Sequence, residues 1–267
     1  MPARDQLRDL ALTAAQAAAD VVRSHARDSD ALTPETKSPA DYVTAVDRLA
    51  EQAAISALRA GSPGVDVLGE EGGGNLAARG WVVDPVDGTT NLVRGFPVVG
   101  VSVALVEEGQ PVVGAVVAPH LGEWWTAIAG EGAWDSAGAR LRVRSPFGSG
   151  VVATGFPFRH KQDLPVYQPV LGGALRRFED LRRAGAACLD LAYTAAGTWD
   201  GFFEMGLSLW DIAAGALLVR EAGGVVTDWD GDAAAVFRSG DILAGSPECH
   251  AALLELTAGA VSARRGT

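Results

Sequence analysis

The stretch that decides the fold of this chain is Trp81-Val82-Val83-Asp84-Pro85-Val86-Asp87-Gly88-Thr89-Thr90-Asn91. Three apolar residues lead into two carboxylates three positions apart, and these lead into Gly-Thr-Thr. A short buried strand that ends in acids presents them at its carboxyl edge, where open α/β sheets bind ligands. Pro85 fixes the backbone after the first acid, and Gly88 lets the main chain approach a ligand closely. Carboxylate oxygens suit Mg²⁺, which shares its coordination with substrate phosphate, so the stretch predicts a metal and phosphate site.

Composition narrows the possible partners of the protein. The chain has 267 residues, 48% of them hydrophobic, which is enough for one large domain or two small ones that share a core. Its formal net charge of −11 argues against broad electrostatic binding to nucleic acid or to an anionic membrane. An acidic protein that handles phosphate must neutralise it locally, and bound cations are the obvious means.

Cysteine and histidine usage makes other kinds of site improbable. Cys188 and Cys249 form no CxxC pair, and the four histidines show no HxxxH arrangement, so neither a disulfide framework nor a zinc site is expected. The first residues carry an acid and lack an apolar signal-peptide run. No stretch reaches the roughly 20 apolar residues that span a bilayer, so we expect a cytoplasmic protein without a membrane partner.

Periodicity and turn residues predict the order of elements. Helices are expected at 7–22, about 46–60, 167–177, 186–196, about 211–222 and the C-terminus. Strands are expected at 65–68, 81–83, 98–106, 112–118, 124–129, 151–153, 201–203, 225–226 and 242–243, with a polar loop at 27–40 and a hairpin turn at 107–110. Strands dominate first and alternate with helices later. This predicts an α+β half over residues 1–145 fused to an α/β half over residues 146–267.

Further acids stand where elements begin or end. Glu70 and Glu71 follow an apolar strand, and Asp84 lies 14 positions after Glu70, which is enough for a loop and a neighbouring strand. The others are an acid just inside a helix, one that ends a strand and one that opens a helix: Asp47, Glu204 and Asp211. Their order and spacing favour one shared site.

Each acid also has a purely structural interpretation. Asp47 lies three residues after Thr44 and could complete a capping box. Asp211 could be a helix N-cap, and Glu70 and Glu71 could be solvated turn charges. Taken singly, most of these acids fit the structural interpretation. Because all of these acids occur together, in order and at compatible spacing, their independent occurrence by chance is improbable.

The motifs together resemble the inositol monophosphatase family. The resemblance rests on Asp-Pro-Val-Asp-Gly-Thr-Thr-Asn at 84–91, Gly-Glu-Glu at 69–71, Trp-Asp-Ile-Ala-Ala-Gly at 210–215 and Glu-Ala-Gly-Gly at 221–224. It extends from Lys37 to about Gly224 and is closest to bacterial members through residues 155–158 and 182–193. The family implies a layered α-β-α-β-α sandwich of the sugar-phosphatase type, usually a homodimer. It also implies Mg²⁺-dependent, lithium-sensitive hydrolysis of small phosphate monoesters.

The resemblance implies a particular set of metal ligands. Glu70, Asp84 and the backbone carbonyl of Val86 would hold one Mg²⁺, while Asp84, Asp87 and Asp211 would hold a second. A third, more weakly bound ion would contact Glu70 through a water molecule. Two ions typically about 3.5–4 Å apart can clamp the attacking and leaving oxygens of an in-line displacement.

The resemblance also implies catalytic and substrate-binding groups. Thr89, with Asp47 or Glu70, would orient a metal-activated water and take its proton. The amides of Gly88 and Thr89, at a helix start, would grip the phosphate. The positions that match substrate contacts in the family are Asp87, Gly88, Thr89, Gly185, Ala186, Ala187, Glu204 and Asp211. The implied substrate is a small phosphorylated polyol, and myo-inositol 1-phosphate is favoured. Lys37 falls in the family's metal-site loop and would meet phosphate or solvent; Ser208 is assigned no role.

Other substrates and functions stay open at this point. Relatives with much the same metal core hydrolyse histidinol phosphate, fructose 1,6-bisphosphate, nucleotide phosphates or NADP. Some bacterial relatives act as binding factors for the transcription or RNA-processing machinery. The Asp-Trp-Asp-Gly sequence at 228–231 resembles the nucleophile motif of haloacid-dehalogenase-type phosphatases. Only 39 residues follow Asp228, too few for the rest of that fold, so we interpret it as an acidic turn.

Overall fold

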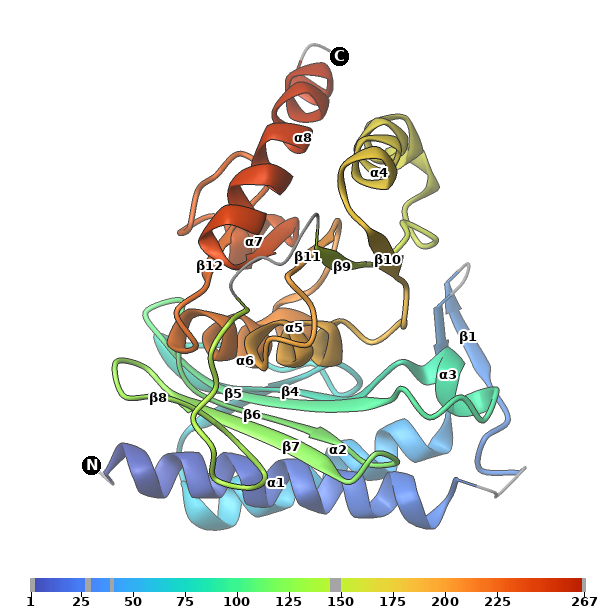
Figure 1. Ribbon diagram of the computed structural model, residues 1–267. Coiled ribbons are helices and arrows are strands. Elements are labelled where there is room, and N and C mark those ends of the chain that lie inside the picture. Colours follow the sequence, from blue (N-terminus) through green and yellow to red (C-terminus); the bar gives the residue numbers. More distant parts are fainter. Residues whose placement is uncertain (1–2, 27–29, 39–40, 145–149, 266–267) are drawn as a thin grey trace.

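The computed structural model describes residues 3–26, 30–38, 41–144 and 150–265. Its first layer consists of two helices, α1 (Arg4–Ser24) and α2 (Ala45–Gly61), which lie side by side beneath the first sheet (Figure 1). The inner face of α1 is built largely from alanines that are fully buried, among them Ala11, Ala14 and Ala18. Because these side chains are small, the helix can lie close to both α2 and the sheet.

The second layer is a six-stranded sheet in the order β3-β4-β5-β6-β7-β8. Only β3 and β4 are parallel, and the other neighbouring pairs are antiparallel. Helices cover both faces, which explains the nearly continuous apolar runs of the central strands. The strands are β3 (Asp66–Gly69), β4 (Arg79–Asp87), β5 (Gly100–Glu107), β6 (Gln110–Ala118), β7 (Glu123–Ile128) and β8 (Gly132–Asp135).

The remaining layers are a helix pair, a second sheet and an outer helix pair. The second sheet has the order β10-β9-β11-β13-β12, with strands β9 (Val151–Thr154), β10 (Asp180–Arg182), β11 (Gly201–Glu204), β12 (Val225–Thr227) and β13 (Ile242–Gly245). Helices α5 (Ala187–Ala195) and α6 (Leu209–Glu221) lie between the sheets, and α4 (Leu164–Arg177) and α8 (Pro247–Arg265) lie outside (Figure 1). The shorter helices are α3 (Thr89–Val93), α7 (Val236–Ser239) and the 3₁₀ helix η1 (Lys161–Asp163). The predicted α-β-α-β-α sandwich is confirmed.

The central helices are apolar on nearly all sides, as expected for helices packed between two sheets. Small residues allow their close approach to the first sheet. A Cβ on Gly100 of β5 would lie only 2.2 Å from Cys188 Sγ, and one on Gly114 of β6 would lie 3.1 Å from Ala214 Cα. This tight packing carries the first turns of α5 and α6 to the end of β4, where the acids lie.

The structure differs from the expected elements in two places that bear on the site. The polar loop expected at 27–40 contains strand β1 (Glu35–Ser38), which pairs with β2 (Asp41–Val43); residues 27–29 and 39–40 lie outside the described residues. The apolar run 81–83 was expected to end in acids, yet β4 continues through both acids to Asp87. Its pairing with β5 shifts register between Asp84 and Asp87, because Pro85 has no N–H for the ladder and a bulge forms.

The expected division at 145/146 falls within residues outside the described part of the chain. The two sheets lie on either side of it in sequence, and the division into halves stays a prediction. Among the described residues, no helix is both long enough and apolar enough to cross a membrane.

Candidate active site

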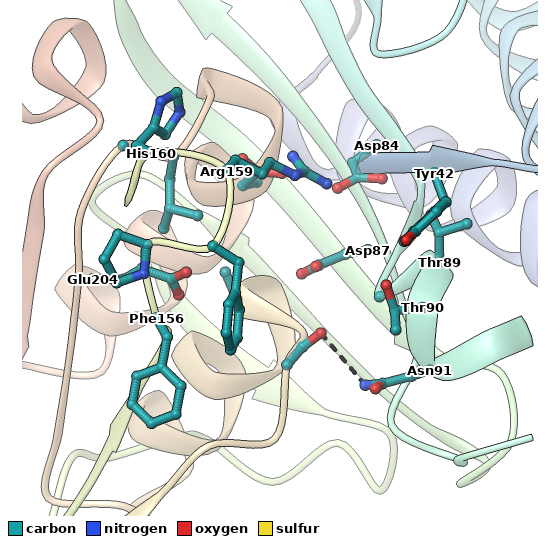
Figure 2. A pocket seen from close by; sticks show the side chains of 18 of the residues that line it. Tyr42, Asp84, Asp87, Thr89, Thr90, Asn91, Phe156, Arg159, His160 and Glu204 are labelled. Atoms are coloured by element: carbon teal, nitrogen blue, oxygen red, sulfur yellow. Dashed lines mark hydrogen bonds between the residues drawn. The ribbon is translucent and has the colours of Figure 1, made fainter. Parts of the chain in front are cut away.

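A pocket of small-molecule size opens where the end of β4, the start of α3, the start of α6 and the end of β11 meet. Figure 2 shows Asp84, Asp87 and Thr89 on one side and Glu204 and Phe156 on the other. Ten of the residues predicted for the site line this pocket: Glu70, Asp84, Val86, Asp87, Gly88, Thr89, Gly185, Ala187, Glu204 and Asp211. Asp47 and Ala186 are almost fully buried and do not line it.

The two carboxylates of the central motif lie at the bulge in β4, where backbone amides fix their orientation. Asp84 is 1% exposed, and its Oδ1 accepts a hydrogen bond of 2.9 Å from the amide of Val86. Asp87 Oδ2 accepts one of 2.6 Å from the amide of Cys188, at the start of α5. A local turn therefore orients the first acid, and the neighbouring helix orients the second.

Gly88 is the link from strand to helix. It is the N-cap of α3 with φ +98°, a left-handed conformation that glycine adopts without strain. A Cβ there would lie 3.1 Å from the carbonyl oxygen of Val98 and 3.2 Å from that of Gly185. The backbone at the predicted phosphate position is therefore enclosed by two other segments, and only glycine fits it well.

Glu70 and Glu71 are not solvated turn charges. Lys37 of β1 reaches both, with Nζ at 3.2 Å from Glu70 Oε1 and 2.5 Å from Glu71 Oε1. Both glutamate side chains are largely buried, at 14% and 7% exposure. Lys37, expected to meet phosphate or solvent, therefore acts as the counter-ion of the acids at the end of β3.

Asp211 has a structural role as well as a place in the pocket. It stands at the third position of α6, and its Oδ2 accepts a hydrogen bond of 2.6 Å from the amide of Ser208. Ser208, which the sequence left without a role, is the N-cap of this helix, so the two residues form a capping box. This contact fixes the carboxylate at the first turn of α6, facing the end of β4.

Asp47 both completes the N-terminal cap of α2 and contacts a residue that lines the pocket. Its Oδ2 accepts hydrogen bonds from the amide and hydroxyl of Thr44, at 2.9 and 2.5 Å, which completes the capping box of α2. Its Oδ1 accepts one of 2.8 Å from the hydroxyl of Thr89. Asp47 thus lies directly behind Thr89, which itself lines the pocket.

Burial raises the pKa of every acid in this group. It raises the pKa of Asp84 well above its usual range, and the charges of Glu70, Asp87 and Asp211 raise it further. Burial raises the pKa of Asp87 to about 6 despite the amide of Cys188, and that of Asp211 to about 7, with a contribution from Asp87. For Glu70, burial and then Asp211 raise the pKa, and Lys37 lowers it. The carboxylates thus destabilise one another in their charged forms.

This donor set fits hard divalent cations. Several oxygen ligands from different elements share one pocket, with a backbone carbonyl at Val86 among them. Among the described residues, no group of three or more His, Cys, Asp or Glu side chains is already arranged to hold a metal ion. Hydrogen bonds to amides and the Lys37 ion pair engage these carboxylates instead. A bound cation would offset the like-charge repulsion that raises their pKa values.

The opposite side of the pocket carries Glu204 at the end of β11. Burial raises the pKa of Glu204 to about 8, and Arg183 lowers it only in part. The carboxyl lies against the backbone of Gly155, where a Cβ would be 1.9 Å from Glu204 Cδ. Arg183 packs over the rings of Phe156 and Phe158, with its guanidinium carbon 5.7 and 5.4 Å from their centroids.

About half of the residues that line the pocket were not predicted from the sequence to belong to the site. The lining residues without a predicted role are Tyr42, Thr90, Asn91, Phe156, Pro157, Phe158, Arg159, His160, Arg183, Met205, Gly206 and Leu207. Residues 155–158 served only to mark a resemblance, although they follow β9 at the carboxyl edge of the second sheet. Because ligands bind at the carboxyl edge of such sheets, this position could have indicated that Phe156 and its neighbours line the site.

The Asp-Trp-Asp-Gly segment forms a turn after β12, as expected. Asp228 Oδ1 accepts hydrogen bonds from the amides of Asp230 and Asp232, at 2.9 and 2.8 Å. Asp228 is 7% exposed and does not line the pocket. Its carboxylate holds a loop together and has no position from which to attack a phosphate there.

Comparison with known proteins agrees with this architecture. The profile of the inositol monophosphatase family matches residues 3–264. The chain is similar to "Nus factor SuhB" of Pseudomonas aeruginosa, with 43% identity over 255 residues that cover 92% of this chain and 93% of that protein. It is also similar to "Nus factor SuhB" of Escherichia coli K12, with 41% identity over 252 residues, 92% of this chain and 93% of that protein.

Solved structures show the same relationship. The extragenic suppressor protein suhB of Bartonella henselae matches with a TM-score of 0.89 and 36% identity, covering 94% of this chain and 98% of that one. The IMPase of Thermotoga maritima matches with a TM-score of 0.86 and 31% identity, covering 97% and 98%. The chain belongs to the inositol monophosphatase family.

Proposed function

We propose that this protein is a Mg²⁺-dependent phosphatase that hydrolyses a small phosphorylated polyol, with myo-inositol 1-phosphate as the favoured substrate. The observation that carries the proposal is the convergence of Glu70, Asp84, Asp87 and Asp211 on one pocket beside Gly88 and Thr89. These carboxylates come from three separate parts of the chain and repel one another when charged. Such a set makes physical sense if cations and a phosphate complete it.

The proposed ligand roles follow the family pattern. Glu70, Asp84 and the carbonyl of Val86 would hold one ion, Asp84, Asp87 and Asp211 a second, and Glu70 a third through water. When bound, these ions supply positive charge that attracts the phosphate and lowers the pKa of a coordinated water. Asp84, which feels the charges of Glu70, Asp87 and Asp211, would contribute to both of the first two ion sites.

Thr89 and Asp47 are proposed to handle the proton of the attacking water. Because Thr89 donates its hydroxyl proton to Asp47 Oδ1 at 2.8 Å, its oxygen lone pairs can accept a hydrogen bond from that water. A proton passed to Thr89 can be matched by the transfer of its own proton to Asp47. Burial raises the pKa of Asp47, which favours this acceptance. The amides of Gly88 and Thr89 are proposed to bind phosphate oxygens.

The polyol is proposed to lie between the acids and the second sheet. Glu204 and Asp211 would receive its hydroxyl groups, and the segment Gly185, Ala186 and Ala187 would border it. Ala186 is buried, so its proposed contribution is through its backbone. A ring with several hydroxyls suits a wall that offers carboxyl oxygens and the donors of Arg183.

A substrate panel tests the proposal. Phosphate release is measured with Mg²⁺ for myo-inositol 1-phosphate, histidinol phosphate, fructose 1,6-bisphosphate, a nucleotide phosphate and NADP, with the Asp84→Asn variant as the control for contaminating activity. We expect the highest kcat/KM for inositol 1-phosphate. A preference of about 100-fold for another ester would replace inositol as the substrate. No Mg²⁺-dependent release from any ester would refute phosphatase function.

A second candidate function is suggested by relatives whose printed name is "Nus factor SuhB". We propose that this chain also acts as a binding factor for the transcription machinery, through a protein partner because its net charge is −11. Complementation separates the two roles. If the Asp84→Asn variant, shown to lack phosphatase activity, restores the phenotype of a deletion strain, binding is the main role. If only the active protein restores the phenotype, hydrolysis is the main role.

Two further properties belong to the same proposal. We propose a homodimer, which analytical ultracentrifugation of the purified protein would detect as twice the chain mass. We also propose inhibition by lithium, measured as loss of phosphate release at saturating Mg²⁺ when LiCl replaces NaCl at equal ionic strength. A monomer at working concentrations, or equal rates in the two salts, would contradict the respective point.

A further inference from the structure

Glu51 is a buried acid that belongs to none of the motifs described above and takes no part in the proposed reaction. It lies on α2, is 4% exposed, and does not line the pocket. Its two carboxylate oxygens accept hydrogen bonds from two successive backbone amides, Oε1 from Glu71 and Oε2 from Gly72, both at 2.8 Å. These amides belong to the turn that carries Glu70.

The turn is shaped around this carboxylate. A Cβ on Gly69 would lie 2.0 Å from Glu51 Oε1, and a Cβ on Gly72 would lie 2.9 Å from Oε2. Two glycines of the turn therefore leave the space that the acid fills. The turn is closed by a hydrogen bond of 3.0 Å from the amide of Gly69 to the carbonyl of Gly73. Its glycines thus give the carboxylate close access to the backbone.

Glu70 is consequently held from both ends. Its own amide donates to the carbonyl of Val83 on β4 at 3.2 Å, which ties it to the strand that carries Asp84. The next two amides, of Glu71 and Gly72, are held by Glu51. The backbone position of Glu70 relative to the other acids depends on these three hydrogen bonds.

Helix α2 connects this turn to the proposed catalytic dyad. Asp47 and Glu51 are four residues apart, so they lie on the same face of the helix, separated by about 6 Å of helical rise. Asp47 holds the hydroxyl of Thr89 at 2.8 Å, while Glu51 holds the turn of Glu70. Because a packed helix is stiff, one element sets the spacing between the two loops.

We propose that Glu51 is a positioning residue that holds Glu70 in place for cation binding. The inference rests on the proposed function, in which Glu70 is a metal ligand. A residue that orients a ligand in this way typically contributes a factor of about 10–100 to metal affinity. Glu51 acts through the backbone of the turn and touches neither substrate nor cation.

The alternative is that Glu51 only stabilises the fold, and the two roles predict different measurements. Glu51→Gln keeps the size of the side chain and one acceptor oxygen, but its amide nitrogen cannot accept a hydrogen bond. Gln52→Ala, at an exposed position on the same helix, is the matched control. Mg²⁺ and Mn²⁺ affinities are measured by calorimetry on the full-length protein without substrate. Hydrogen exchange is measured at the amides of Glu71 and Gly72.

We expect Glu51→Gln to weaken metal binding about 10–100-fold and to speed exchange at the two amides, while Gln52→Ala changes neither. The half-saturating Mg²⁺ concentration should rise by the same factor, with KM for the phosphate ester nearly unchanged. Gly72→Ala provides a second variant, since its Cβ disturbs the same hydrogen bond from the other side. It should weaken metal binding in the same way.

A double variant decides between positioning and simple stabilisation. In a Glu70→Gln background the ligand is already lost, so Glu51→Gln should cause little further loss of metal affinity. A full-sized further loss, or a lower melting temperature with metal affinity within about twofold of wild type, would overturn the proposal. If the wild type bound no Mg²⁺, the proposed function would fail by itself. Exchange at the two amides would then still decide whether Glu51 holds the turn, and equal rates in Glu51→Gln and Gln52→Ala would overturn that.

Discussion

Replacement of Asp87 by asparagine should have opposite effects on stability and on activity. Asp87 lies at the end of β4, where burial raises the pKa of its carboxyl from 3.8 to about 6. Asparagine has nearly the same shape, and its side-chain oxygen can still accept the hydrogen bond from the amide of Cys188. The substitution therefore removes one buried negative charge and little else.

The size of the effect follows from the pKa difference. A carboxyl whose pKa is higher in the folded than in the unfolded chain binds its proton more tightly when folded, so stability is lost as pH rises from about 4 to about 6. The rise from 3.8 to about 6 corresponds to about 3 kcal/mol at pH 8. In metal-free buffer at pH 8, Asp87→Asn should therefore raise the free energy of unfolding by about 3 kcal/mol. At pH 4 it should change little.

Bound cations should reduce this stability difference between the variant and the wild type. Urea unfolding is measured at pH 4, 6 and 8, once with EDTA and once with excess Mg²⁺, for the wild type, Asp87→Asn and the exposed control Asp66→Asn. A ligand at 100 times its Kd stabilises a protein by about 2.7 kcal/mol, and the variant should gain less than the wild type. Its kcat should fall about 10²–10³-fold.

Two results would refute this reasoning. If Asp87→Asn destabilised the metal-free protein at pH 8, the carboxylate would be stabilised there by a positive partner rather than penalised by burial. If the variant kept its activity within about tenfold of the wild type, Asp87 would not be a metal ligand. The Asp66→Asn control should change neither quantity, because this position is exposed and lies outside the pocket.

Three other substitutions test the remaining assignments. Asp84→Asn should lower kcat in a phosphate-release assay by at least about 10²–10³-fold, since a single strong electrostatic contribution is lost, and a change below about tenfold would reject Asp84 as the bridging ligand. Glu204→Gln should raise KM for inositol 1-phosphate more than KM for p-nitrophenyl phosphate, which has no hydroxyls to bind; equal shifts would contradict a polyol contact. Asp228→Ala should leave kcat/KM nearly intact while it destabilises the protein by about 1–3 kcal/mol in urea unfolding, because two turn amides lose their acceptor. Abolished hydrolysis in a folded Asp228→Ala variant would revive the nucleophile interpretation.

The layered fold was predictable because long apolar segments and glycine turns mark its main elements. The strands that were missed, β1, β2, β8 and β10, have only three or four residues each. In β1 and β10 the segments are polar, and their extended form depends on pairing with a neighbouring strand. Short pairings of this kind are decided by tertiary contacts and leave little periodicity in the sequence.

The acidic half of the site was predictable for a similar reason. An acid that follows an apolar run stands at a sheet edge, so Glu70, Asp84 and Asp87 were marked by local pattern and by family motif. Arg183 and the rings of Phe156 and Phe158 carry no such mark. Their contacts form across a segment of more than 20 residues, and only the fold shows that they meet at the pocket. Glu51 lies four residues after Asp47 on the same helix face. This spacing was a signal in the sequence that Glu51 faces the same region as Asp47.

The structure also explains why the acidic side and the Glu204 side of the pocket should respond together to mutation. The side chain of Asn91 on α3 donates to the carbonyl of Val98 at 2.7 Å and to that of Ala184 at 2.9 Å, the residue after Arg183. Asp87 is held by an amide of α5, and the hydroxyl of Ser102 on β5 donates to the carbonyl of Trp210 at 3.0 Å. The bonds of Asn91 to Ala184, of Cys188 to Asp87 and of Ser102 to Trp210 connect residues 84–102 with residues 184–210. Because these bonds link the segment of the proposed metal ligands to the starts of α5 and α6, a shift of α5 or α6 moves the proposed metal ligands and the proposed polyol contacts at once.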